Sequence, residues 1–122
     1  MRTYGLIGFP LSHSFSQKYF SDKFKKENIT DCEFKNFSLE SIDQLSQLLE
    51  QTPTLCGLSV TIPHKKSVMR LLNDMDSTAK KIGAVNCIRI QNKKLTGYNT
   101  DVHGFEQSLK PLLNKHHKQA LI

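Results

Sequence analysis

The sequence of 122 residues lacks the signals of several large protein classes. No apolar run approaches the roughly 18 residues that a membrane-spanning helix needs. The N-terminus has one arginine and a short apolar stretch broken by Gly8 and Pro10, so it does not resemble a signal peptide. We therefore expect a cytoplasmic protein that has no membrane partner.

The few cysteines and histidines form no disulfide or metal-binding pattern. Cys32, Cys56 and Cys87 are odd in number and far apart, and no C-x-x-C pair occurs. His116 and His117 stand side by side without a spaced third ligand, and the sequence H-E-x-x-H is absent. We expect no metal ion, and we expect the three cysteines to be buried as small hydrophobic residues.

The six glycines nowhere form the sequence G-x-G-x-x-G, so the chain carries no fingerprint of a dinucleotide-binding domain. Its length is enough for one hydrophobic core but not for two full domains. With 38% hydrophobic and 23% charged residues, the composition is that of a globular protein, which argues against a disordered or collagen-like chain.

Acidic residues are absent after Glu106, although Lys110, Lys115 and Lys118 follow. Three of the six excess positive charges therefore lie in the last thirteen residues. Nucleic-acid-binding domains usually gather Lys and Arg on one folded face, often with aromatic residues between them. We expect no nucleic-acid partner. The alternative, a basic nucleic-acid-binding domain, predicts salt-sensitive binding.

Short β-like runs alternate with segments of helical period along the chain, a pattern typical of α/β domains. It predicts a three-layer domain with a mixed, mostly parallel sheet flanked by helices. The polar residues 91–94 predict an antiparallel hairpin. The expected strands cover residues 3–7, 32–37, 55–60, 84–90 and 95–98. The expected helices begin at Ser16 as a cap, after Ser38, at Pro63 and near Ser77, and a last one runs from Val102 until Pro111 ends or kinks it.

Four polar clusters stand at the ends of the expected strands, over residues 12–16, 59–65, 84–86 and 97–101. The carboxyl ends of parallel strands share one edge of a sheet, where ligands bind in α/β proteins. The clusters offer hydroxyl, amide, ammonium and carboxylate groups and little aromatic surface. This set suits a small polyhydroxylated ligand that bears a carboxylate.

Spacing alone leaves structural readings of the same residues open. Ser14 and Ser16 suit a turn or a cap, and Lys65 suits a solvated surface. Asp101 precedes an expected helix and suits an N-cap. Asn86 stands inside an otherwise apolar strand, where an amide needs a partner for each polar group.

The same clusters carry a family resemblance. Residues 8–16 resemble the signature G-x-P-x-x-H-S-x-S-P of shikimate dehydrogenases, and residues 57–65 resemble their G-x-N-V-T-x-P-x-K. Residues 84–86 are similar to A-V-N-T, and residues 97–104 to G-x-N-T-D-x-x-G. The four motifs occur in the family's order and cover essentially the whole chain. The chain is identified as resembling the N-terminal substrate-binding domain of this family.

The resemblance implies an enzyme of aromatic amino-acid biosynthesis that reversibly reduces 3-dehydroshikimate to shikimate with NADPH. It implies that Ser14 and Ser16 hold the substrate carboxylate. It further implies that Lys65 and Asp101 are catalytic, with Lys65 acting on the C3 oxygen. The implied substrate-binding residues are Ser14, Ser16, Ser59, Thr61, Lys65, Asn86 and Asp101. NADP would be bound by a second domain, and a homodimer is compatible with the resemblance.

Two positions depart from the family pattern. Ser59 stands where the family usually has Asn, which shortens the side chain and replaces an amide by one hydroxyl. Gln17 replaces the Pro that usually opens the first helix. The first change puts affinity or ring-substituent preference in doubt, whereas we expect the second to affect stability rather than chemistry.

The resemblance also implies a domain boundary near the end of the chain. We expect residues 1–116 to form the substrate-binding domain and residues 117–122 to begin a truncated NADP-binding domain. This chain alone is then predicted to bind substrate weakly and to be inactive. Two alternatives remain: a dehydrogenase of quinate or another shikimate analogue, and a stand-alone shikimate-binding module without catalysis.

Overall fold

A single mixed sheet of six strands organises the computed structural model, which describes residues 1–12 and 14–121. The strands lie in the order β2-β1-β3-β5-β6-β4. Strand β5 runs antiparallel to both of its neighbours, and the other pairs are parallel. Their bounds are β1 Arg2–Gly8, β2 Cys32–Ser38, β3 Leu55–Val60, β4 Asp74–Met75, β5 Cys87–Gln91 and β6 Lys94–Tyr98. The prediction of a mixed, mostly parallel sheet is confirmed.

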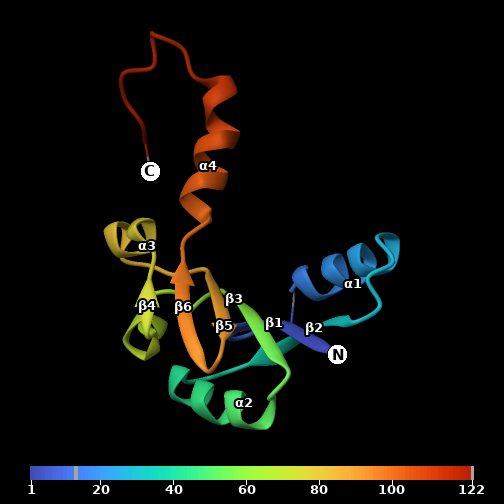
Figure 1. Ribbon diagram of the computed structural model, residues 1–122. Coiled ribbons are helices and arrows are strands. Elements are labelled where there is room, and N and C mark those ends of the chain that lie inside the picture. Colours follow the sequence, from blue (N-terminus) through green and yellow to red (C-terminus); the bar gives the residue numbers. More distant parts are fainter. Residues whose placement is uncertain (13, 122) are drawn as a thin grey trace.

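Four α-helices accompany the sheet in the described part of the chain: α1 Ser16–Lys26, α2 Leu45–Gln51, α3 Ser77–Ile82 and α4 Asp101–Leu109. Three short 3-10 helices cover Ile42–Gln44, Ser67–Leu71 and Lys110–Leu112. Helices α1 and α2 lie on opposite faces of the sheet (Figure 1), which gives the three layers expected of this fold class. None of the described helices is both long and apolar enough to cross a membrane.

The core fills the face of the sheet that α2 covers. Leu45 and Leu48 of α2 are buried with Ile7 of β1 and with Leu58 and Val60 of β3. The helical spacing of the leucines predicts this helix correctly, but the helix starts later than expected. Ser41 caps the 3-10 helix Ile42–Gln44 that directly precedes α2: its Oγ accepts from the Asp43 amide, and its own amide donates to Gln44 Oε1.

The structure also moves two further predicted boundaries. The helix expected from Pro63 is a turn, closed by a bond from His64 N to Thr61 O, and a 3-10 helix begins only at Ser67. The strand expected from Ala84 begins at Cys87, because the Val85 amide turns away from the ladder and donates to Lys65 O.

The cap predicted at Ser16 is also wrong. Ser16 is the first residue of α1, because the carbonyl of Phe15 already accepts the helical bond from Tyr19 N. Two positions of the predicted features, His13 in the first polar cluster and Ile122 at the end of the chain, lie outside the described residues.

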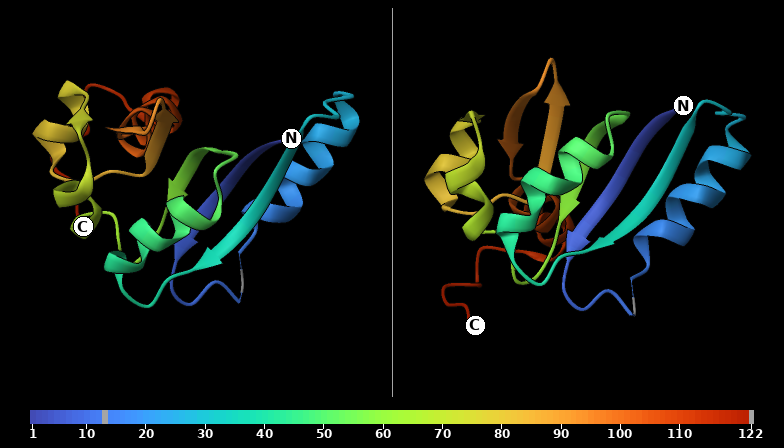
Figure 2. Two further views of the ribbon diagram at one scale, coloured as in Figure 1. Left: turned by 60° about the horizontal axis from the view of Figure 1, so that its bottom comes forward. Right: turned by 90° about the horizontal axis from the view of Figure 1, so that it is seen from below.

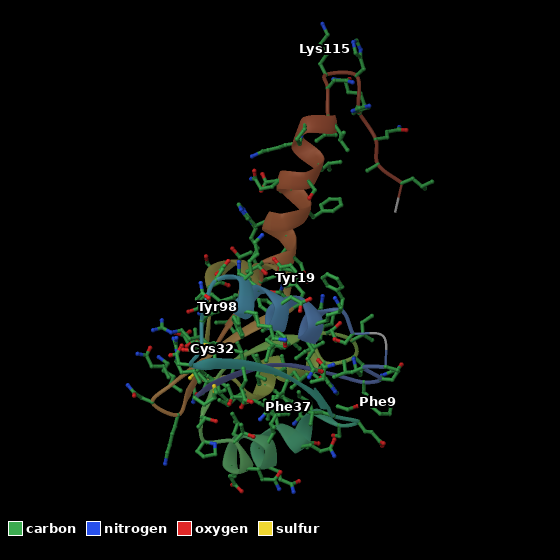
Figure 3. The ribbon with its side chains drawn as sticks, turned by 90° about the vertical axis from the view of Figure 1, so that its right-hand side faces the viewer. Phe9, Tyr19, Cys32, Phe37, Tyr98 and Lys115 are labelled. Atoms are coloured by element: carbon green, nitrogen blue, oxygen red, sulfur yellow. The ribbon has the colours of Figure 1, made fainter. Side chains whose placement is uncertain are left out.

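Helix α4 projects from the body of the domain, and the C-terminal segment continues from its far end (Figure 1). The right-hand view of Figure 2 shows this segment lying apart from the sheet. Residues 101–108 are exposed, Phe105 among them, and Lys115 lies well away from the sheet (Figure 3). The predicted helix is therefore present, and Pro111 lies in the short 3-10 turn that follows it.

The three cysteines are half-buried, not buried as predicted. They line a hollow of about 480 Å³ beside α1, together with aromatic side chains such as Phe24 and Phe34. Helix α1 leaves this hollow open to solvent, so the thiols keep part of their exposure.

Candidate functional site

The four polar clusters lie at one edge of the sheet, although the strands that carry them run in two opposite directions. Strands β1, β3 and β6 run parallel and end at this edge, so the loops after them carry the first, second and fourth clusters. Strand β5 runs the opposite way, so the segment before it, which carries Asn86, also lies there. The expectation that all four clusters share an edge agrees with this topology.

Lys65, Asn86 and Asp101 are in direct contact at this edge. Lys65 Nζ lies 2.7 Å from Asp101 Oδ2, and Asn86 Nδ2 donates to Asp101 Oδ1 at 3.1 Å. Each carboxylate oxygen of Asp101 therefore has its own donor. Asn86 is held in turn by Thr100, whose Oγ accepts from Asn86 Nδ2 at 2.7 Å and whose amide donates to Asn86 Oδ1 at 2.9 Å.

A buried histidine anchors the loop that carries Lys65. His64 is 3% exposed, and its Nε2 lies 2.6 Å from the Leu39 carbonyl oxygen. Because a carbonyl can only accept, this contact assigns the ring hydrogen to Nε2. The Lys65 carbonyl accepts from Val85 N at 2.8 Å, so the lysine backbone is fixed on both sides. This leaves the lysine side chain, which is only partly exposed, directed at Asp101.

Three of the predicted hydroxyl residues surround a separate small cavity. Ser14, Ser16 and Thr61 line about 310 Å³ of space with Leu6 as part of the wall. Ser14 Oγ also donates to Asn36 Oδ1, at 3.4 Å. Several hydroxyl groups around one small space can donate to the two oxygens of a carboxylate.

Ser59 lies in the neighbouring hollow beside α1, not in the serine cavity. The two spaces adjoin, because Leu6 lines the cavity and its register partner Ser59 lines the hollow. Cys87 is the partner of Ser59 on the other side. Burial raises the pKa of the Cys87 thiol, which keeps it uncharged at neutral pH.

Two alternative readings from the sequence are settled by these contacts. Asp101 does not cap α4: it is the first helical residue, and the Oδ1 of Asn99 accepts from the Val102 amide instead. Asn86 does not lie within a strand, and its amide hydrogens both have acceptors. Within residues 1–12 and 14–121, no three His, Cys, Asp or Glu side chains are grouped as metal ligands.

Sequence patterns assign no role to His64 or Asn99, although both stand in the polar clusters. His64 precedes Val68 by four positions, a spacing that indicates a shared buried face. Asn99 is 7% exposed and bonds to the backbone of Ala84 and of Val102. No local pattern indicates the bond to Ala84, which lies 15 positions away.

Comparison with known proteins identifies the family of the chain. The family model described as shikimate dehydrogenase substrate binding domain matches residues 6–88. The chain belongs to this family. It is 46% identical over 107 residues to a shikimate dehydrogenase (NADP(+)) of Clostridium beijerinckii, a match that covers 86% of this chain and 39% of the relative.

Solved structures of shikimate dehydrogenases share the fold of this domain. The crystal structure of shikimate dehydrogenase 1 from Peptoclostridium difficile superposes with a TM-score of 0.80 at 35% identity, over 91% of this chain and 41% of that one. The Thermus thermophilus enzyme, solved in complex with NADP(H) and shikimate, gives a TM-score of 0.80 at 25% identity, over 91% and 42%. The chain thus spans about two fifths of the length of these relatives.

Proposed function

We propose that this domain binds the substrate of an NADP-dependent shikimate dehydrogenase that reversibly reduces 3-dehydroshikimate to shikimate. The observation that carries the proposal is the Lys65–Asp101–Asn86 cluster beside a cavity lined by hydroxyl groups. The relatives bear this enzyme's name, and one solved relative contains shikimate.

The two parts of the site suit the two ends of such a ligand. The hydroxyls of Ser14 and Ser16 would donate to the ring carboxylate. Thr61 lines the same cavity and lies four positions before Lys65, so it suits a ring hydroxyl between the carboxylate and the reacting carbon. Asn86 and Asp101 would bind the hydroxyls nearest to Lys65.

Lys65 would supply the proton at the reacting oxygen. Reduction of the C3 ketone builds negative charge on oxygen, which an ammonium group both stabilises and can protonate. The carboxylate of Asp101, 2.7 Å away, restrains the flexible lysine side chain and sets its direction. In the reverse reaction the same pair would accept the proton of the C3 hydroxyl.

None of the residues of this chain is assigned to NADP. The sequence has no G-x-G-x-x-G turn, and within residues 1–12 and 14–121 no strand-to-helix connection provides the phosphate-binding glycines of a dinucleotide site. NADPH supplies the hydride in enzymes of this kind, and we propose that a further domain binds it. We also propose that residues 1–116 form the substrate-binding domain and that this chain alone is inactive.

A titration of the chain with shikimate tests the proposal, with backbone amide chemical shifts as the readout. We expect progressive shifts near Ser16, Thr61, Asn86 and Asp101. Shifts confined to residues 110–121, or no shifts at millimolar shikimate, would contradict the proposed function. Quinate and cyclohexanecarboxylate serve as comparison ligands, and tighter binding of quinate would favour the analogue dehydrogenase.

A matched pair of serine variants separates specific from general effects. Ser16→Ala removes a hydroxyl from the cavity and should weaken shikimate binding by roughly tenfold, the effect of losing a hydrogen bond to a charged group. Ser108→Ala removes a hydroxyl that is bonded to the Gly104 carbonyl on α4, far from the cavity, and should leave binding unchanged.

A further inference from the structure

Three consecutive residues, Ala84 to Asn86, connect every element that carries the Lys65–Asp101–Asn86 cluster. The Val85 amide donates to the Lys65 carbonyl at 2.8 Å. The Asn86 amide donates to the Tyr98 carbonyl at 3.0 Å, and the Asn86 carbonyl accepts from Val60 N at 2.8 Å. The position of this segment therefore sets the distance between the lysine loop and the start of α4.

One side chain joins this segment to α4. Asn99 Nδ2 donates to the Ala84 carbonyl at 3.0 Å, and Asn99 Oδ1 accepts from the Val102 amide at 3.2 Å. Asn99 is 7% exposed, so water competes weakly for these bonds. Its amide thus spans the segment that bears Asn86 on one side and the helix turn that bears Asp101 on the other.

The side chain suits this task because it is both donor and acceptor on one rigid plane. An aspartate at this position would keep the bond to the Val102 amide but would place an oxygen against the Ala84 carbonyl. An alanine would lose both bonds. Asn99 is not bonded to any residue of the serine cavity, so any effect on the ligand must pass through Asn86 and Asp101.

We infer that Asn99 is a positioning residue that holds Asn86 and Asp101 at the separation the ligand requires. This inference rests on the proposed function for the identity of the ligand, shikimate. The hydrogen-exchange measurement that tests the structural part does not depend on that function. The inference assigns to the first residue of the N-T-D sequence a role distinct from that of the aspartate.

Asn73 provides a matched control. Its Oδ1 accepts from the Leu95 amide at 2.7 Å, so Asn73→Ala also deletes a bond from an asparagine side chain to the backbone, at the opposite end of β6. Asn73 does not line the serine cavity or contact the Lys65–Asp101–Asn86 cluster.

The experiment measures the shikimate dissociation constant of the folded chain by amide shifts, and hydrogen exchange of the Val85 amide without ligand. We expect Asn99→Ala to raise the dissociation constant about tenfold and to speed Val85 exchange relative to the Ile7 amide, since one buried bond is lost on each side. Asn73→Ala should leave both quantities within about twofold. Because only folded molecules contribute to the fitted constant, a general loss of stability does not raise it.

Several outcomes overturn the inference. Wild-type affinity in Asn99→Ala contradicts it, as does an equal loss in Asn73→Ala. Should Asn99→Ala not fold, Asn99→Asp replaces it, and wild-type affinity in that variant contradicts the link through Ala84. If the unmodified chain does not bind shikimate, the proposed function fails, and unchanged Val85 exchange in the Asn99 variants then decides against the positioning role separately.

Discussion

Lys65 Nζ and Asp101 Oδ2 lie 2.7 Å apart although 36 positions separate the two residues in the chain. The lysine comes from the turn after β3 and the aspartate from the first residue of α4. Antiparallel β5 lies between β3 and β6 in the sheet. The pair therefore joins a turn and the start of a helix, which meet only because the sheet orders its strands in this way.

Loss of the Lys65 ammonium group should affect turnover more than binding. In a complete enzyme that contains this domain, we expect Lys65→Ala to lower kcat by about a hundredfold or more, because the developing oxyanion loses its charge partner and proton donor. Substrate binding should be largely retained, since Ser14, Ser16 and Thr61 are untouched. Steady-state kinetics measure both quantities. Lys66→Ala, an exposed neighbour, is the control, and near-normal turnover in Lys65→Ala would remove Lys65 from its assigned role.

Restoring the family's usual residue at position 59 should tighten shikimate binding. Ser59 borders the serine cavity through its register partner Leu6, and the longer amide of asparagine could reach the ligand where the hydroxyl does not. We expect Ser59→Asn to lower the dissociation constant by about five- to tenfold, the effect of one added hydrogen bond. Calorimetric titration measures the change. An unchanged constant would show that another group compensates for the serine.

Substitution by alanine should have opposite effects on stability at Gly97 and at Gly104. A Cβ at Gly97 would lie 2.5 Å from Leu72 Cδ1 and 2.9 Å from Val85 Cγ2, and Val85 is fully buried. We expect Gly97→Ala to lower the free energy of unfolding by about 1–3 kcal/mol, because the core is overpacked. A Cβ at Gly104 meets nothing within 4 Å on α4, so Gly104→Ala should stabilise the helix by about 0.5–1 kcal/mol.

Urea denaturation tests the Gly97 variant, and far-ultraviolet circular dichroism tests the Gly104 variant through its helix content. Equal destabilisation by both substitutions would contradict the packing at Gly97 as the cause.

The ion pair between Asp43 and Arg70 should make stability depend on pH in the acid range. The hydrogen bond from Arg70, followed by its positive charge, lowers the pKa of the Asp43 carboxyl. The unfolded chain therefore binds this proton more readily than the folded chain. The stabilisation is complete above the ordinary aspartate pKa of about 3.9 and is lost as pH falls through the lower folded pKa.

We expect Asp43→Asn to lower the Tm at pH 6, and we expect the difference from the unmodified chain to shrink as the pH is lowered below about 4. Thermal denaturation followed at several pH values measures this. Arg70→Gln should reproduce the effect, and the double variant should add little to either single one. A Tm difference that stays constant down to pH 2 would rule out this ion pair as its source.

Short β-like runs and segments with helical spacing of apolar residues were enough to predict most strands and helices, including the β5–β6 hairpin. Asn92 and Lys93 at its tip have positive φ angles, as a two-residue hairpin turn requires. Prediction failed where distant residues decide the local conformation. The turn at His64 depends on Leu39, and the bend at Val85 depends on Lys65.

The sequence by itself determined which chemical groups stand at the ends of the strands. Polar residues that follow a run of apolar residues can be recognised from the order of residues alone. The sequence also determined the family, through four ordered motifs. Only the tertiary structure decided that Lys65, Asn86 and Asp101 touch, that Ser59 faces a different hollow from Thr61, and that Asn99 bridges two segments. The reason is physical: a hydrogen bond forms only when donor and acceptor lie within a few tenths of an ångström of about 2.9 Å. Strand order and packing between residues far apart in the chain set these distances.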